Sequence, residues 1–195
     1  DVGAKKASAL ARRVQDPLYE WSRIDPMQAA IGDLRDEVYQ SPLARRLESV
    51  REDVLHEMGV DLERATTDTL ALIGGMGRET ALKILLERDS EGGLTSLQAL
   101  AEKQHIGAST LDDAGPFLRL AGSEPLDALR IPPSQYGRVE EIAASLSLTK
   151  AQLLEKPSEL ERIQHPAFQR DDVAQGVFRV VLDELRAPTR DTRPN

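Results

Sequence analysis

The chain has 195 residues, no cysteine and a formal net charge of −8, with 40% hydrophobic and only 4% aromatic residues. Without cysteine there are no disulfides, no thiolate metal sites and no cysteine nucleophiles. The acidic balance excludes a surface that coats nucleic acid over its whole extent. Helix formers such as Ala, Leu, Glu and Arg are abundant and β-branched residues are sparse, so we expect an all-α fold.

The positive charge is concentrated at the two ends of the sequence. Residues 1–13 carry four basic residues against one acidic residue, and residues 186–195 carry three against one. The body between them is strongly acidic, so any contact with nucleic acid has to be local. No apolar run approaches the ~20 residues that span a bilayer, and no signal peptide is visible. We therefore expect no membrane partner and a cytoplasmic location.

Helices are expected from the start of the chain. Residues 4–14 predict a helix that ends before the Asp16–Pro17 pair. A turn-rich connector follows as far as Pro26. It contains the single tryptophan, Trp21, which we expect to be buried as a packing anchor. The alternative is that Trp21 is an aromatic residue of a binding site.

Two further helices are expected before the centre of the chain. The first covers residues 33–40. The second starts with Ser41 as N-cap and has Pro42 in its first turn. Gly59 ends it, because glycine is favoured just beyond the last helical turn. Its apolar face would hold Leu43, Leu47, Val50, Val54 and Leu55.

The centre of the sequence, residues 70–88, reads LALIGGMGRETALKILLER. Apolar residues recur at helical spacing on both sides of three glycines, and glycine permits a tight bend between two helices. We expect Asp68 to be the N-cap of the first helix and Arg78 to begin the second. The glycine bend resembles the helix-hairpin-helix motif, and the residues that fit its pattern are Gly74, Gly75, Met76, Gly77 and Ala81.

The amide groups of such a bend, and of the first turn after it, are free to bind an anion. We predict that this anion is a nucleic-acid phosphate. Contacts of this kind position a strand without reading its sequence. Few basic groups take part, so binding of DNA or RNA by this chain alone should be weak and should fall with added salt. The alternative is a purely structural turn. The predicted binding residues are Gly74, Gly75, Met76, Gly77, Arg78 and Lys83.

A weak internal repeat, offset by 30 residues, indicates a second hairpin. The offset pairs Gly77 with Gly107 but places His105 at the position of Gly75. The second copy also lacks the basic residues of the first and has two adjacent aspartates in its second helix. We therefore expect it to be structural. It would close a small common core with the first hairpin through Leu111, Phe117 and Leu118.

The remainder predicts short helices separated by proline breaks, followed by a linker. Residues 187–195 show no apolar periodicity and form the expected linker. The helices before it should begin at polar caps. These caps are Ser134, Thr149, Ser158, and either Asp171 or Asp172.

The order of these landmarks resembles the Tex family of bacterial transcription accessory proteins. Four blocks carry the resemblance: ARRVQDPLYEWSRIDP at 11–26, MGVDLERAT at 58–66, GPFLRLAGSEPLDALRIPPSQY at 115–136 and LDELRAPTRDTRP at 182–194. The resemblance implies that the chain is a piece of a longer protein. It also implies five segments: the end of a YqgF-like domain with a connector at 1–32, connecting helices at 33–60, tandem helix-hairpin-helix motifs at 61–122, a C-terminal helical segment at 123–186 and a linker at 187–195.

Two functional hypotheses follow. In the first, the chain is a non-enzymatic module that makes sequence-independent phosphate contacts through the first hairpin. In the second, it is a protein-interaction or spacer module whose acidic helices hold other domains or dock on the transcription machinery. We expect no enzyme, cofactor or metal site. Adjacent carboxylates on a helix point about 100° apart, the glycine bend lacks the lysine of a phosphate-binding loop, and no metal-ligand spacing relates His56, His105 and His165.

Overall fold

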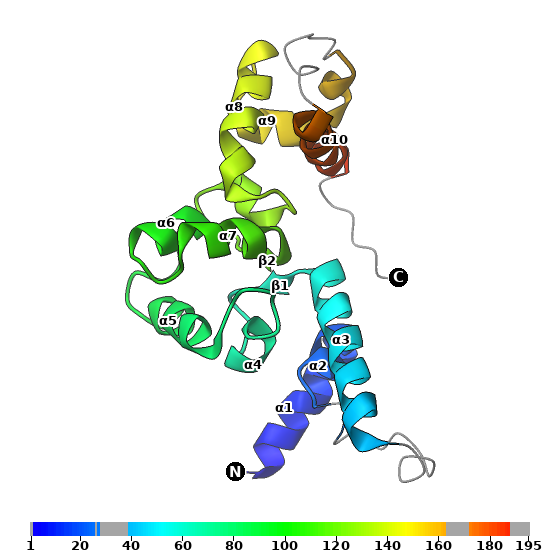
Figure 1. The fold of residues 1–195 in the computed structure, drawn as a ribbon. Coiled ribbons are helices and arrows are strands. Elements are labelled where there is room, and N and C mark those ends of the chain that lie inside the picture. The colour runs from blue at the N-terminus through cyan, green and yellow to red at the C-terminus, as the bar shows by residue number, and fades with distance from the viewer. Residues whose placement is uncertain (1, 26, 28–38, 163–171, 188–195) are drawn as a thin grey trace.

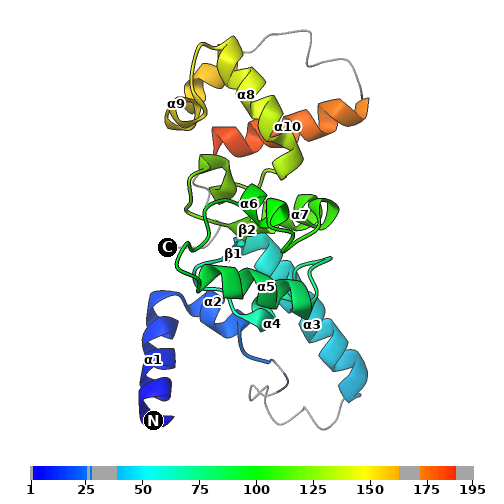
Figure 2. The ribbon, with the colours of Figure 1, turned by 90° about the vertical axis from the view of Figure 1, so that its left-hand side faces the viewer.

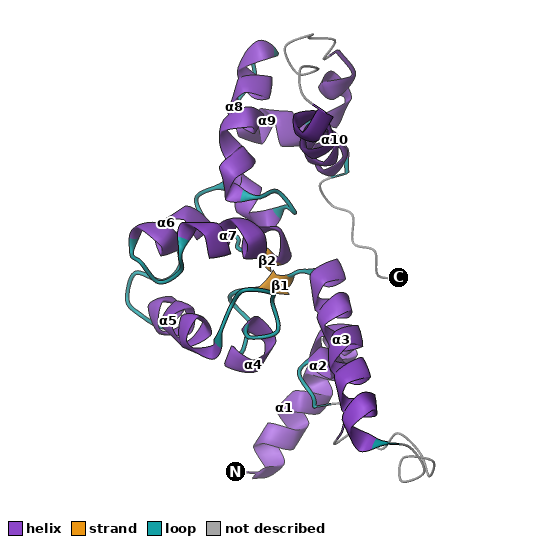
Figure 3. Cartoon of the chain, viewed as in Figure 1, coloured by secondary structure: helices purple, strands orange, loops and turns teal. Residues whose placement is uncertain are grey.

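The computed structural model describes residues 2–25, 27, 39–162 and 172–187. Helices dominate the described chain, and its strands, orange in Figure 3, are very short. The all-α prediction is therefore confirmed. None of the described helices is both long and apolar enough to cross a membrane. Figure 1 and Figure 2 show three groups of elements that follow one another along the molecule: residues 2–58, residues 60–119 and residues 125–187.

The first group contains α1 (Val2–Gln15), α2 (Pro17–Ser22) and α3 (Gln40–Met58). The prediction that Trp21 is buried is wrong, because this residue is 52% exposed whereas Tyr19 is 4% exposed. Residues two apart on a helix point about 200° from each other, so only one of the pair faces the interior. α2 begins after Asp16, whose carboxylate accepts a hydrogen bond from the Tyr19 amide at 3.2 Å.

α3 ends where the sequence predicts but begins differently. Tyr39 occupies its N-cap position without a side-chain hydrogen bond, so the prediction of Ser41 as N-cap is wrong. Gly59 follows the last turn, as predicted, with φ +75°. A Cβ atom there would lie 2.8 Å from Cζ of Arg119, so any other residue would be strained at this φ and would displace the Arg119 side chain. The helix predicted over residues 33–40 lies almost wholly outside the described residues.

The middle group is two helix pairs closed by a short parallel ladder. The ladder pairs Val60 with Leu118, and the sequence did not indicate it because two residues are too few to show strand periodicity. The prediction of Asp68 as N-cap is wrong, since Thr66 caps α4 through a capping box with Thr69. The elements in chain order are β1 (Val60–Asp61), α4 (Thr67–Leu70), α5 (Arg78–Arg88), α6 (Leu97–Glu102), α7 (Ala108–Ala114), the 3-10 helix η3 (Gly115–Phe117) and β2 (Leu118–Arg119).

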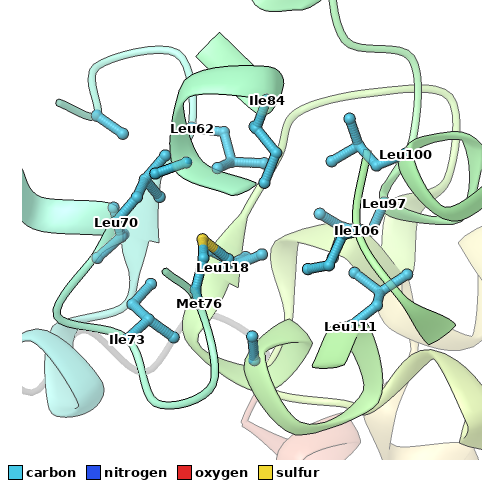
Figure 4. Packing of buried hydrophobic residues seen from close by; sticks show 14 of the residues in the cluster. Leu62, Leu70, Ile73, Met76, Ile84, Leu97, Leu100, Ile106, Leu111 and Leu118 are labelled. Atoms are coloured by element: carbon cyan, nitrogen blue, oxygen red, sulfur yellow. The ribbon is translucent and has the colours of Figure 1, made fainter. Parts of the chain in front are cut away.

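The two helix pairs share one hydrophobic core, seen in Figure 4. Each bend sends one apolar side chain into this core, Met76 from the first bend and Ile106 from the second, and both are buried. The predicted contributions of Leu111 and Leu118 are confirmed, and Phe117 packs against the cluster while remaining partly exposed. The unit is therefore held together by apolar packing that neither helix pair could supply alone.

The last group packs around a second hydrophobic cluster. Thr149 caps α9 and α10 starts at Asp172, as predicted. The predictions of Ser134 and Ser158 as helix caps are wrong, because each lies inside a 3-10 helix. The elements are η4 (Pro125–Ala128), η5 (Pro133–Gln135), α8 (Tyr136–Ser145), α9 (Lys150–Glu155), η6 (Pro157–Arg162) and α10 (Asp172–Arg186).

A buried carboxylate connects the last group to the middle group. Asp127 is fully buried, and its Oδ2 accepts a hydrogen bond at 2.7 Å from the amide of Leu97, the first residue of α6. Its Oδ1 accepts one at 2.8 Å from the hydroxyl of Tyr136, at the start of α8. Burial raises the pKa of Asp127 above its usual range. This one side chain therefore fixes the second hairpin against the C-terminal helices.

Candidate nucleic-acid interface

The first bend, between α4 and α5, presents its glycines to solvent. Gly74, Gly75 and Gly77 are all exposed. Gly75 has φ +79°, a left-handed conformation that costs other residues about 1–2 kcal/mol. Gly77 has an ordinary φ of −76° and is the N-cap of α5, which begins at Arg78 as predicted. Of the three glycines, Gly75 is thus the one whose backbone conformation requires glycine.

The hydrogen-bond donors of this bend are only partly available. The Met76 amide donates to the Ile73 carbonyl at 3.0 Å, and the Met76 side chain is 2% exposed. Met76 therefore serves the core rather than the surface. The amides of Gly75 and Gly77 donate to no other described residue, and no side chain caps the first turn of α5. These unoccupied donors belong to exposed residues next to the positive end of a helix dipole.

Both cations predicted for the site already have acidic partners. The Arg78 guanidinium lies 2.9 Å from the Asp68 carboxylate, and the Lys83 ammonium lies 2.8 Å from Glu79. The hydrogen bond from Lys83 holds the pKa of Glu79 below its usual range. Both pairs are exposed to solvent, and exposed ion pairs are worth only about 0–1 kcal/mol. Breaking the Arg78–Asp68 pair would therefore cost little.

The second bend, between α6 and α7, is built differently. Its left-handed residue is Gln104, with φ +58°, rather than a residue at the position of Gly75. The following amide, that of His105, donates to the Leu100 carbonyl at 3.0 Å, which closes the end of α6 with the chain's own acceptor. The Lys103 and His105 side chains both bind the carboxylate of Glu87 on α5. The basic groups near this bend therefore hold the two helix pairs together.

A further bend of the same kind joins α8 to α9, and the sequence interpretation missed it. Ser147 is left-handed with φ +58°, and the Leu148 amide donates five residues back, to the Ala143 carbonyl, at 2.9 Å. This repeats the hydrogen bond of the second bend. No glycine marks the turn, so the available signal was the capping box of Thr149 and Gln152. The box engages the amides of Thr149 and Gln152, so this bend leaves fewer of its amides unoccupied than the first bend does.

Two protein-family models match the sequence. The model described as "Helix-hairpin-helix motif" covers residues 56–119, which are the end of α3 and the whole middle group. The model described as "HHH domain" covers residues 124–193, which include the bend between α8 and α9. Helix-hairpin-helix sequence therefore extends beyond the tandem pair that the sequence interpretation recognised.

Curated proteins match over nearly the full chain. It is 34% identical over 194 residues, 99% of this chain, to "Transcriptional accessory protein Tex" of Neisseria gonorrhoeae. It is 34% identical over 195 residues to "Protein YhgF" of Escherichia coli. The chain is a Tex-like helix-hairpin-helix region. It spans about a quarter of the length of these relatives, 26% of the first and 25% of the second.

A human protein is similar to part of the chain. The human "S1 RNA-binding domain-containing protein 1" is 29% identical over 120 residues, which are 62% of this chain and 12% of the human protein. The Tex-like region is thus similar to segments of both bacterial and human proteins. Of the six predicted site residues, Met76 is buried in the core and the other five are exposed.

Proposed function

We propose that this Tex-like region is a nucleic-acid-binding module that contacts the phosphate backbone without reading sequence. The contact is made by the amides of Gly75 and Gly77, the first turn of α5, and the side chains of Arg78 and Lys83. The observation that carries the proposal is the exposed start of α5, which has no side-chain cap and keeps amide donors that no described residue occupies. Helix starts of this kind bind phosphate through backbone amides and the helix dipole.

The relatives support the same ligand class. One is named for transcription and one for RNA binding. Within the longer protein we propose five segments. Residues 1–32 are the end of a YqgF-like domain, and the helices of residues 33–60 connect it to the tandem helix-hairpin-helix motifs at 61–122, which bind nucleic acid. Residues 123–186 form a C-terminal helical segment, and residues 187–195 are a linker.

A competing function is favoured by one observation. Arg78 and Lys83 are each paired with an acidic neighbour, so the local charge of the first bend is balanced before any ligand arrives. A protein-interaction or spacer module would have this property. The two functions differ in whether the chain binds nucleic acid at low salt and whether that binding depends on the first bend.

The test is fluorescence anisotropy with labelled DNA and RNA, comparing the wild type with Arg78→Glu and Lys103→Glu. Both substitutions change the net charge equally, and both residues are exposed cations on a hairpin. We expect Arg78→Glu to weaken binding roughly tenfold and to reduce the salt slope by about 1, with little effect from Lys103→Glu. Equal losses in the two variants, or no binding by the wild type at low salt, would refute the proposal.

A further inference from the structure

The carboxylate of Asp68 is not used to cap its own helix. The cap of α4 is Thr66, whose hydroxyl accepts a hydrogen bond from the Thr69 amide. The Asp68 carboxylate instead accepts a hydrogen bond at 2.9 Å from Nη1 of Arg78, the first residue of α5. No other hydrogen bond to the Asp68 side chain occurs among the described residues. The contact of this carboxylate is therefore with a cation of the proposed phosphate site.

A second carboxylate, that of Glu79, lies in the first turn of α5. A negative charge at this place interacts favourably with the positive end of the helix dipole, as a bound phosphate would. The same carboxylate lies 2.8 Å from the Lys83 ammonium, one turn further along the helix. Each cation of the proposed site thus has a carboxylate of the first hairpin in the place where a phosphate would bind it.

The internal repeat shows that the fold does not need these two ion pairs. At the four equivalent positions, 30 residues further along, the second hairpin has no such pair; the residues there are Gln98, Ala108, Ser109 and Asp113. Both hairpins nevertheless pack into the same core. The pairs occur at the bend whose Gly75 and Gly77 amides have no acceptor among the described residues, and they are absent from the bend that satisfies the His105 amide internally.

The pair between Asp68 and Arg78 is open enough to be exchanged. The two side chains are 62% and 71% exposed, and ion pairs as exposed as this one are weak. A phosphate that binds Arg78 replaces one negative partner by another, so the guanidinium keeps its charge neutralised throughout. The affinity for the phosphate is nevertheless lowered by whatever free energy the internal pair contributes, because that pair has to be broken first.

We propose that Asp68 and Glu79 are internal competitors of the phosphate, which bind Arg78 and Lys83 in the free protein and are displaced by nucleic acid. The first bend is in this sense autoinhibited, since two carboxylates of its own hairpin keep its affinity low. The inference rests on the proposed function and adds to it the regulation of the same site.

A double-mutant cycle, measured by fluorescence anisotropy with a labelled duplex at low salt, tests the first pair. Asp68→Asn should raise the affinity about threefold, because Arg78 no longer has to be released from a partner. Asp89→Asn is the matched control, since it removes the same charge from another exposed Arg–Asp pair, at the opposite end of α5. In the Arg78→Gln background, Asp68→Asn should give no more gain than the control does.

The same cycle with Glu79→Gln and Lys83→Gln tests the second pair. We expect a smaller gain of about twofold from Glu79→Gln, because this pair joins neighbours on one helix and the Glu79 side chain is 84% exposed. The gain should disappear in the Lys83→Gln background. A gain that is equal in the two backgrounds would show that Glu79 acts through general charge and would remove it from the mechanism.

The outcomes distinguish this inference from the proposed function. Equal gains in Asp68→Asn and Asp89→Asn, or a gain that persists in the Arg78→Gln background, would overturn the competition. A loss of affinity in Asp68→Asn would overturn it too, because Asp68 would then position Arg78 for the phosphate. In each of these cases the proposed function stands as long as Arg78→Glu weakens binding. If Arg78→Glu has no effect, the phosphate contact fails and the competition fails with it.

Discussion

The first and second hairpins contribute equally to one core and differently to the surface. Met76 and Ile106 fill corresponding places in the shared cluster. The first bend turns at Gly75 and leaves the Gly75 and Gly77 amides without an acceptor among the described residues, whereas the second turns at Gln104 and satisfies the His105 amide internally. The fold thus requires one buried apolar side chain at each bend but imposes little on the residues around it. Those residues are free to serve binding in one copy and cohesion in the other.

The largest expected effect tests the equality of the two copies in the core. Met76→Ala and Ile106→Ala should each lower the free energy of unfolding by about 3 kcal/mol, because each removes a buried side chain and leaves a cavity. Urea unfolding followed by circular dichroism would measure both changes. A loss in one variant and none in the other would show that only one hairpin contributes to the cooperative core.

The next effect tests what holds the second hairpin in place. Asp127→Ala should cost about 2 kcal/mol, because it leaves the Leu97 amide and the Tyr136 hydroxyl buried without an acceptor. Tyr136→Phe, which removes one of the two hydrogen bonds, should cost about 1 kcal/mol. Asp112→Ala is the control, since its hydrogen bond to the Ser134 amide is exposed. An equal cost for Asp112→Ala and Asp127→Ala would contradict the role given to the buried carboxylate.

A smaller effect separates the two bends by backbone conformation. Gly75→Ala should cost about 1 kcal/mol, because Gly75 is left-handed and alanine is strained there. Gly107→Ala should cost less, about 0.5 kcal/mol, since Gly107 has φ −68° and room for a methyl group and loses only the advantage of glycine over alanine as N-cap. Thermal unfolding of the two variants side by side gives the comparison. Equal destabilisation would mean that the bends are under the same conformational constraint.

The smallest effect is a pH dependence at the contact between the second hairpin and the last group. Burial raises the folded-state pKa of Asp127, so the folded protein keeps this proton to higher pH than the unfolded chain does. The free energy of unfolding should therefore fall as pH rises from the ordinary aspartate pKa through the folded-state pKa. Asp127→Asn does not titrate. The wild type should accordingly lose stability relative to this variant across that window, as measured by urea unfolding at a series of acidic pH values.

The sequence was informative where a short segment determines its own structure. The glycine spacing gave the start of α5, and Gly59 and Thr149 ended or began helices as expected. The sequence was misleading or silent where contacts between distant segments determine the structure. The sequence favours Trp21 as the inward residue, but Tyr19 is the buried residue of the two, and Arg64 from a distant part of the sequence packs on it. The bend at Ser147 carries no glycine, and its repeat of the second bend is visible only in hydrogen bonds.

In the candidate site, too, some features follow from the local sequence and others depend on tertiary contacts. The exposed amides of the first bend follow from local chemistry, so they could be expected from the glycines and the start of a helix. The pairing of Arg78 with Asp68 joins residues on different helices, and the burial of Met76 depends on the second hairpin. Neither could be inferred from spacing. The sequence therefore predicts where an anion could bind more readily than how much charge remains to attract it.

The two-residue ladder between β1 and β2 has a mechanical consequence. The chain enters the hairpin pair through β1 and leaves it through β2, and the two strands are parallel. Tension between the ends of the chain would pull these strands in opposite directions along their length, so their hydrogen bonds would be loaded in shear. The Leu62 amide, which donates to the Arg119 carbonyl at 2.9 Å, extends that clamp. Force transmitted from α3 to the C-terminal helices would thus be carried by the β1–β2 hydrogen bonds. The hairpins would bear no load until these hydrogen bonds break.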